Sequence, residues 1–103
     1  MKTTQKIHKK IAPFQYDSDR FLEELISFSG FYELDQWIEL NIDGEEHLSL
    51  DLFPITIDDV LNFIEEFEMY EDKNEYDSAK FNRLKKFILE MDNETEYYYE
   101  ILN

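Results

Sequence analysis

Cysteine is absent from this chain of 103 residues, and its absence excludes several kinds of site. A chain without cysteine has no disulfide bonds, no thiolate metal ligands and no cysteine nucleophile. Glycine is nearly as scarce, since Gly30 and Gly44 are the two in the chain, too few for a loop that cradles phosphate groups. The lack of cysteine fits a reducing compartment, so we expect a cytoplasmic protein.

Long hydrophobic runs are also missing, and no stretch approaches the length of a membrane-spanning helix. The first ten residues carry four lysines and no acidic residue, but no apolar core follows them as in a secretory signal. Hydrophobic residues make up 43% of the chain, enough to bury a core. We expect a basic leader over residues 1–16, with an optional short edge strand over 7–14, and a single domain over 17–103.

Basic residues are rare through the middle of the chain. Residues 17–72 contain eighteen acidic residues and one basic residue, Arg20, and the net charge of the whole chain is −15. Such a segment repels DNA, RNA and anionic membrane surfaces, and it attracts basic proteins. We therefore expect a basic protein as the partner, with no direct binding of nucleic acid or membrane.

An N-terminal helix is predicted over roughly residues 17–30. Asp17 or Ser18 can cap its first turn, and Gly30 is a suitable stop. The apolar residues between them recur at helical spacing, and they are Phe21, Leu22, Leu25, Ile26 and Phe28.

A β-hairpin is predicted for the next segment, because large aliphatic residues alternate with polar ones from Trp37 to Phe53. A tight turn at Asp43-Gly44 would pair Ile42 with Glu45, an apolar residue with a polar one. We therefore expect even positions to pair with even positions through a bulged or longer turn over residues 43–47. The expected inner face consists of Ile38, Leu40, Ile42, Leu48, Leu50 and Leu52.

Two or three further helices are expected after Pro54. Thr56 and Asp59 form a capping box, and Asp77 or Ser78 can cap a later helix. The first helix is expected to bury Ile57, Val60, Leu61, Ile64 and Phe67. The second is expected to bury Phe81, Leu84, Phe87 or Ile88, and Met91. A short last helix is expected to bury Tyr97, Tyr98, Ile101 and Leu102. The predicted class is α+β, with an N-terminal helix, an antiparallel hairpin and then helices packed on the hairpin's apolar face.

Catalytic and metal-binding constellations are hard to build from these residues. The two histidines, His8 and His47, lack the spacing of a metal pair on a helix. His47 near Asp51 can imitate a general base with its orienting carboxylate, but an exposed turn histidine is the favoured interpretation. The segment from Asp72 begins like a calcium loop and lacks its glycine and closing glutamate. We expect no enzyme activity, no metal and no cofactor.

The predicted partner-binding surface consists of carboxylates around one tryptophan. Carboxylates at regular spacing can imitate a nucleic-acid backbone and pair with the Lys and Arg residues of a basic protein. The residues assigned to this surface are Asp35, Trp37, Glu39, Glu45, Glu46, Asp51, Asp58, Asp59, Glu65, Glu66, Glu68, Glu71 and Asp72.

Simpler interpretations stay open for each of these features. The acidic residues can form an ordinary solvated face. Trp37 is either an exposed anchor or packed beneath a helix. A separate basic patch of Lys80, Arg83, Lys85 and Lys86 suits a helix C-terminus, or a symmetric dimer in which it meets the acidic face of a second copy.

In composition the chain is like small acidic proteins that block nucleic-acid enzymes. The leading hypothesis is a non-enzymatic inhibitor, such as a phage-encoded antagonist of a CRISPR effector or a restriction nuclease, that mimics DNA in its target's binding cleft. One alternative is an immunity protein or antitoxin that neutralises a cognate toxin. Another is a regulatory or assembly module that uses the Tyr97-Tyr98-Tyr99 run, with an incidental acidic face.

Overall fold

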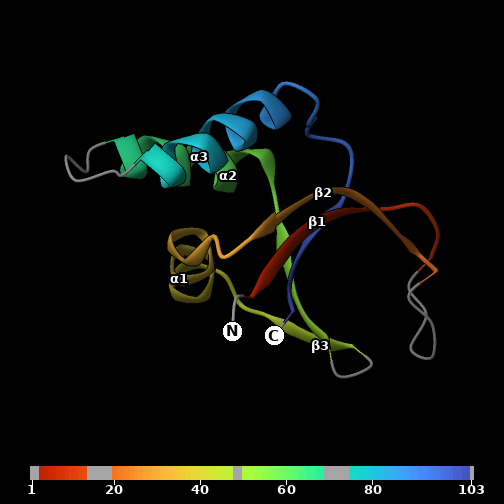
Figure 1. Ribbon diagram of the computed structural model, residues 1–103. Helices are drawn as coiled ribbons and strands as arrows, with labels where there is room; N and C mark the ends of the chain where they lie inside the picture. The colour runs from red at the N-terminus through yellow and green to blue at the C-terminus, as the bar shows by residue number, and fades with distance from the viewer. Residues whose placement is uncertain (1–2, 14–19, 48–49, 69–74, 103) are drawn as a thin grey trace.

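The computed structural model describes residues 3–13, 20–47, 50–68 and 75–102, and for 45–47, 50–51 and 75–77 the backbone alone. Five strands and three helices occur in these residues (Figure 1). In chain order they are β1 (Thr4–Lys10), β2 (Leu22–Ser29), α1 (Tyr32–Asn41), β3 (Glu45–His47), β4 (Leu50–Ile55), α2 (Ile57–Glu68), α3 (Glu75–Ile88) and β5 (Tyr97–Leu102). The α+β class predicted from the sequence is confirmed.

The five strands form one antiparallel sheet in the order β2-β1-β5-β4-β3. The first and last strands of the chain lie side by side, with Thr4 opposite Leu102 and Ile7 opposite Tyr99. β1 is therefore an interior strand of the sheet, whereas an edge position had been expected for it. The three helices lie together on one side of the sheet (Figure 1).

A chain of aromatic rings runs through the helical layer. Phe31 lies 5.8 Å from Phe63, which lies 5.6 Å from Phe67, and Phe67 lies 4.8 Å from Phe81 between ring centroids. These contacts connect the start of α1 to α2 and α3. The sheet completes this core with buried side chains such as Tyr99.

The predicted N-terminal helix is wrong, because residues 22–29 form the strand β2. Ile7 of β1 pairs with Ile26, but the next residue, His8, pairs with Glu24, so Leu25 is an extra residue that bulges out of the ladder. A bulge shifts the alternation of the side chains by one residue. The resulting spacing of apolar residues imitates a helical period.

The first strand of the predicted hairpin is also wrong, because residues 32–41 form the helix α1. Phe31, Leu34 and Ile38 are buried at helical spacing, whereas Leu40, expected inside, is 84% exposed. Short apolar segments often satisfy both periods, and here burial against α2 and the sheet selects the helix.

A hairpin does exist further along the chain, where β3 pairs with β4. Residues 45–47, expected in the turn, belong to β3, and the reversal at 48–49 lies outside the described residues. Glu45 pairs with Leu52 and His47 with Leu50, so odd positions pair with even ones. The predicted register and turn are therefore wrong.

The two helices predicted after Pro54 are confirmed as α2 and α3. The capping box closes in both directions, since the Thr56 amide donates to Asp59 Oδ2 (2.8 Å) and the Asp59 amide donates to Thr56 Oγ1 (3.2 Å). Leu61 is 46% exposed, and Phe63 takes its expected place in the core. All five residues predicted for the core of the next helix are buried, namely Phe81, Leu84, Phe87, Ile88 and Met91.

The predicted last helix is wrong, because residues 97–102 form the strand β5. Tyr97 and Tyr99 alternate along one face and are 4% and 0% exposed. β1 on one side and β4 on the other satisfy the hydrogen bonds of this strand. Tyrosine and isoleucine favour strands when such neighbours exist, and those neighbours come from distant parts of the chain.

Candidate partner-binding surface

The acidic residues of α2 have different environments. Asp58, Glu65 and Glu66 are exposed, whereas Asp59 is half-buried and its carboxylate caps the helix. Glu68 is exposed and forms an ion pair with Lys85 of α3 (2.8 Å). The side chains available for an external partner are therefore those of Asp58, Glu65 and Glu66. The Glu68 carboxylate already pairs with a lysine of α3.

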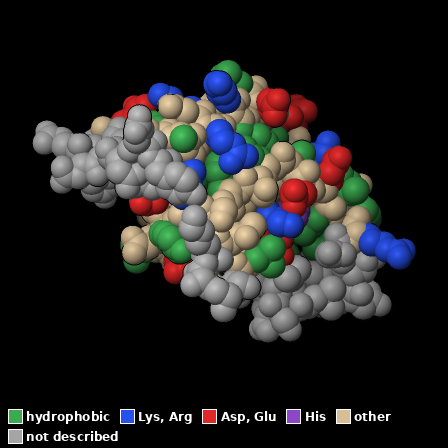
Figure 2. Space-filling view, viewed as in Figure 1, with side chains coloured by type: hydrophobic (Ala, Val, Ile, Leu, Met, Phe, Trp, Pro, Cys, Tyr) green, Lys and Arg blue, Asp and Glu red, His purple; other side chains and the backbone are tan. Residues whose placement is uncertain are grey.

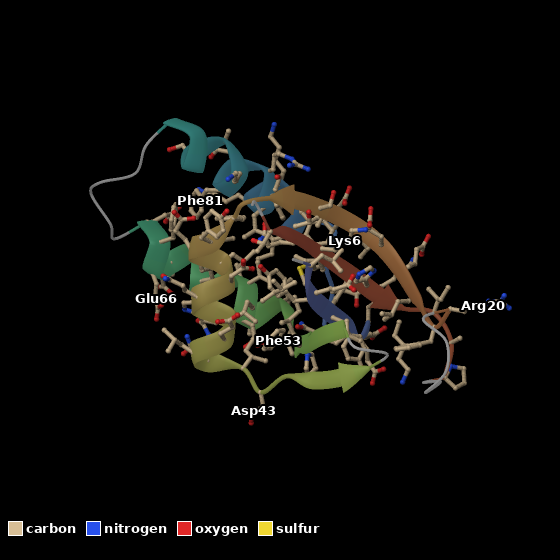
Figure 3. All side chains as sticks on the ribbon, turned by 60° about the horizontal axis from the view of Figure 1, so that its bottom comes forward. Lys6, Arg20, Asp43, Phe53, Glu66 and Phe81 are labelled. Atoms are coloured by element: carbon tan, nitrogen blue, oxygen red, sulfur yellow. The ribbon has the colours of Figure 1, made fainter. Side chains whose placement is uncertain are left out.

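Trp37 connects α1 to α2. Its indole Nε1–H donates to Glu66 Oε2 (2.6 Å), and its ring lies edge-on to Phe63 at 6.1 Å. The side chain is half-buried against the core. Trp37 is thus packed beside α2, and it orients the Glu66 carboxylate at the surface. Figure 3 shows Glu66 beside α1 at the left of the view, and Lys6 on the sheet.

Asp35 lies inside the protein, although the sequence pattern had assigned it to the acidic surface. It is 8% exposed, and its carboxylate accepts hydrogen bonds from the Tyr99 hydroxyl and from Gln5 Nε2 (2.8 Å). Burial raises the pKa of the Asp35 carboxyl above its ordinary value, and the hydrogen bonds from Tyr99, Gln5 and Thr3 oppose this rise. Asp35 is therefore an internal residue rather than a contact for a partner.

Two acidic residues extend the surface at the C-terminal end of α1. Glu39 is exposed on the helix, and Asp43 is exposed just after it (Figure 3). Asp43 had been treated as a turn residue and was not among the predicted contacts. A helical interpretation of residues 32–41 would have indicated it, because the residues after a helix end are commonly exposed.

Five of the predicted contacts lie beyond what the structure describes. Glu45 and Glu46 belong to β3 and Asp51 to β4, but the placement of their side chains is not described. Glu71 and Asp72 lie between α2 and α3, outside the described residues. These five residues stay predictions. Among the described residues, the exposed acidic side chains of α1, of α2 and of the segment just after α1 that form no ion pair are Glu39, Asp43, Asp58, Glu65 and Glu66, and we call this set the acidic helix surface.

Three lysines of β1 form ion pairs with acidic residues of neighbouring segments. Lys6 pairs with Glu24 (2.7 Å), Lys9 with Glu23 (3.2 Å) and Lys10 with Glu96 (2.9 Å). The hydrogen bond to Glu24 raises the pKa of Lys6. The sequence reasoning missed this ladder because it depends on strand pairing. The concentration of lysines in the first ten residues is its one local signal.

The cations of α3 attach this helix to neighbouring elements. Lys80 is 6% exposed and donates to the Gly30 carbonyl oxygen (2.9 Å), and Arg83 donates to the Ser27 carbonyl oxygen (3.0 Å) at the edge strand β2. The Arg83 guanidinium also lies over the Phe28 ring, 4.9 Å from its centroid. Most of the predicted basic patch therefore makes internal contacts, while Lys86 is exposed.

His8 and the C-terminal tyrosines lie within the sheet. His8 is an interior residue of the sheet, with Nε2 2.8 Å from Glu100 Oε1, and Tyr97 and Tyr99 of the C-terminal aromatic run are buried. Within the described ranges, no group of three or more His, Asp or Glu side chains is placed to hold a metal ion. Among the same residues, no helix has the length and apolar character needed to cross a membrane.

Comparison with other proteins gives no family for this chain. No protein family model matches it, and neither a curated protein nor a solved structure matches it. The function therefore has to be argued from the surface itself.

Proposed function

We propose that this protein is a non-enzymatic inhibitor that docks its acidic helix surface in the nucleic-acid-binding cleft of a basic protein. The observation that carries the proposal is the separation of the charges. Within the part of the chain that the structure describes, the five carboxylates of this surface form no ion pair, while lysines of β1 pair with acidic residues of β2 and with Glu96, which precedes β5.

The composition of the helices makes the surface one-sided. Neither α1 nor α2 contains a lysine or an arginine. A helix whose exposed face is only solvated is commonly stabilised by oppositely charged side chains four residues apart, and α1 and α2 have no such pairs. Unpaired carboxylates create a negative field that attracts a cationic cleft and speeds association at low salt.

The chemistry of the carboxylates suits a partner that grips phosphates. Arginine side chains bind carboxylates and phosphates through the same fork of N–H donors, so a nucleic-acid-binding cleft can accept either anion. Trp37 holds Glu66 in one position through its indole hydrogen bond (2.6 Å), which lowers the entropy lost when Glu66 meets a cation. The target class that fits best is a nuclease of a defence system.

The test compares two sets of substitutions that change the net charge equally. Glu39→Gln, Asp58→Asn and Glu65→Gln neutralise the acidic helix surface. Glu23→Gln, Glu24→Gln and Glu96→Gln neutralise acidic partners of the sheet lysines. The wild-type protein is used to capture partners from a lysate at low salt, and the captured nuclease is purified for binding measurements.

We expect the captured nuclease to be released by high salt and by competing DNA or RNA. The helix-surface variant should bind it about tenfold more weakly, while the sheet variant should bind almost as tightly as wild type. Equal losses in both variants, or binding indifferent to salt, would overturn the proposal. Capture of one toxin that binds beside its active site would favour an immunity protein instead.

A further inference from the structure

A buried polar cluster joins α1 to the centre of the sheet. Gln5 of β1 and Tyr99 of β5 are both 0% exposed, and Asp35 of α1 is 8% exposed. The Tyr99 hydroxyl donates to Asp35 Oδ1, and Gln5 Nε2 donates to Asp35 Oδ2 (2.8 Å). Thr3 adds a third donor at 3.3 Å. One carboxyl group therefore receives hydrogen bonds from both strands beneath the helix.

Gln5 also fixes the start of the helix. Its Oε1 atom accepts a hydrogen bond from the Phe31 amide (2.8 Å), the residue that precedes α1. Its Nε2 group donates to Thr3 Oγ1 (2.7 Å) as well as to Asp35. Every polar atom of this side chain thus takes part in attaching α1 to β1.

The groups that face Asp35 are neutral. Gln5 of β1 and Thr3, which precedes this strand, carry no charge. Burial, and to a lesser extent the nearby Asp35 charge, raises the pKa of Tyr99, so this hydroxyl remains a donor. Glu39 of α1 adds a further negative charge near Tyr99. Beside the start of the helix, the Lys80 ammonium group donates to the Gly30 carbonyl oxygen. Among the described residues, no ion pair includes Asp35.

We propose that Asp35 is a pH-sensitive latch for α1, tightest when its carboxyl group is protonated and looser when it is ionised. A buried anion without a cation is costly, and removing its charge relieves that cost while the Tyr99 hydrogen bond is kept. The Thr3 hydroxyl oxygen, which donates to the ionised carboxylate, can then accept a hydrogen bond from the protonated carboxyl group, since a hydroxyl is both donor and acceptor. Gln5 and Tyr99 act as positioning residues for this group.

The sign of the effect follows from linkage. Because the folded-state pKa of Asp35 is raised, the stability that its protonated form contributes is fully present below the unfolded-state value. That contribution is lost as the pH rises through the folded-state value. α1 should therefore open more readily as the pH rises through this window, in contrast to the usual behaviour of a carboxylate.

The consequence for partner binding rests on the proposed function, because α1 carries Glu39 and the indole that orients Glu66. The latch itself does not depend on any partner. Its test therefore uses the isolated protein, and its failure is distinguishable from a failure of the proposed function.

The experiment follows the Asp35 side chain by NMR, using its 13Cγ shift as a function of pH. Asp43 and Asp58 are exposed and serve as internal references. Amide exchange of Leu34 and Ile38 in α1 is measured across the same range as protection factors, with Phe63 in α2 as the comparison. The variants are Asp35→Asn, Tyr99→Phe and, as a control that removes an exposed hydroxyl, Tyr32→Phe.

We expect Asp35 to titrate above the ordinary pKa of an aspartate side chain. Protection of the α1 amides should fall severalfold relative to Phe63 as the pH rises through the Asp35 midpoint. Tyr99→Phe should shift this midpoint further upward and lower α1 protection about tenfold, because a buried carboxylate loses a donor. Tyr32→Phe should leave both quantities unchanged.

Two results would overturn the latch. One is an Asp35 midpoint at or below the ordinary pKa of an aspartate side chain. The other is α1 protection that does not follow the Asp35 midpoint, or follows it equally in Asp35→Asn. If Asp35→Asn does not fold, because its amide group would face Gln5 Nε2, the Tyr99→Phe and Tyr32→Phe pair still decides the outcome.

Discussion

The sheet and the helical layer of this protein treat their charges in opposite ways. Along β1, lysines meet acidic residues of neighbouring segments, and Lys and Arg side chains are interspersed with Asp and Glu on the face seen in Figure 2. On α1 and α2, Glu68 pairs with Lys85 of α3, and Asp35 and Asp59 form internal hydrogen bonds. Glu33 of α1 is half-buried. The other described acidic side chains of these two helices are exposed and form no ion pair. The comparison teaches that net charge is a poor guide to a surface until strand pairing is known.

The largest expected effect separates two acidic residues of the same helix. Asp35→Ala leaves Tyr99 and Gln5 without their acceptor, so it should lower the free energy of unfolding by about 3 kcal/mol. Glu39→Ala, one turn further along and exposed, should change it by no more than about 0.5 kcal/mol. Urea denaturation of both variants measures the difference. Equal effects would show that Asp35 is not internal.

A smaller effect is expected at the junction between the two regions. Gly30 connects β2 to α1 with φ of 70°, and its amide donates to the Thr3 carbonyl oxygen (2.7 Å). A side chain at this φ is strained, so Gly30→Ala should cost about 1–2 kcal/mol. The measurement is the shift of the thermal midpoint. An unchanged midpoint would mean that the junction can adopt another conformation.

Two aspartates should give opposite pH dependences of stability. Hydrogen bonds from Thr95 and Glu94 lower the pKa of Asp92, whereas burial raises the pKa of Asp35. The stability that Asp92 contributes is present above its unfolded-state pKa and is lost as the pH falls through the folded-state value. The contribution of Asp35 is lost as the pH rises.

Denaturation of Asp92→Asn and Asp35→Asn across the acidic range checks this prediction. The stability difference between wild type and Asp92→Asn should grow with rising pH, and the difference for Asp35→Asn should shrink. Parallel slopes for the two variants would contradict the assignment of Asp35 as a residue whose charge is disfavoured by burial.

The smallest expected effect tests the comparison directly, through one acidic residue in each region. Glu24→Gln removes the partner of Lys6 and should destabilise the protein by about 0.2–1 kcal/mol. Glu65→Gln relieves repulsion on the acidic helix surface and should stabilise it by a few tenths of a kcal/mol. Added salt should reduce both differences. Changes of the same sign would break the distinction between the two regions.

The success of the sequence predictions depended on how local the deciding interactions are. Thr56 and Asp59 lie three residues apart, so the capping box and the helix α2 were evident from the chain alone. The strand β5 was predicted as a helix, because its two neighbours, β1 and β4, lie far away in the chain. The strand β2 was also predicted as a helix, because its bulge at Leu25 is recognisable only from the pairing of β2 with β1.

The candidate surface was predictable to a similar degree. The exposure of Glu39, Asp58, Glu65 and Glu66 agrees with the sequence-based assignment. Asp35 was placed on the wrong side because its segment was taken for a strand. A carboxylate is seldom buried, so nothing in composition indicates that Gln5 and Tyr99 converge on it.

The sequence by itself determined the class of the fold, the helices α2 and α3, and the absence of Lys and Arg from residues 21–72. Tertiary structure alone decided which strands neighbour each other, which lysines are paired, and which acidic side chains face outward. The physical reason is distance along the chain. Capping and helical periodicity act over a few residues, whereas strand pairing and burial join segments separated by most of the chain's length.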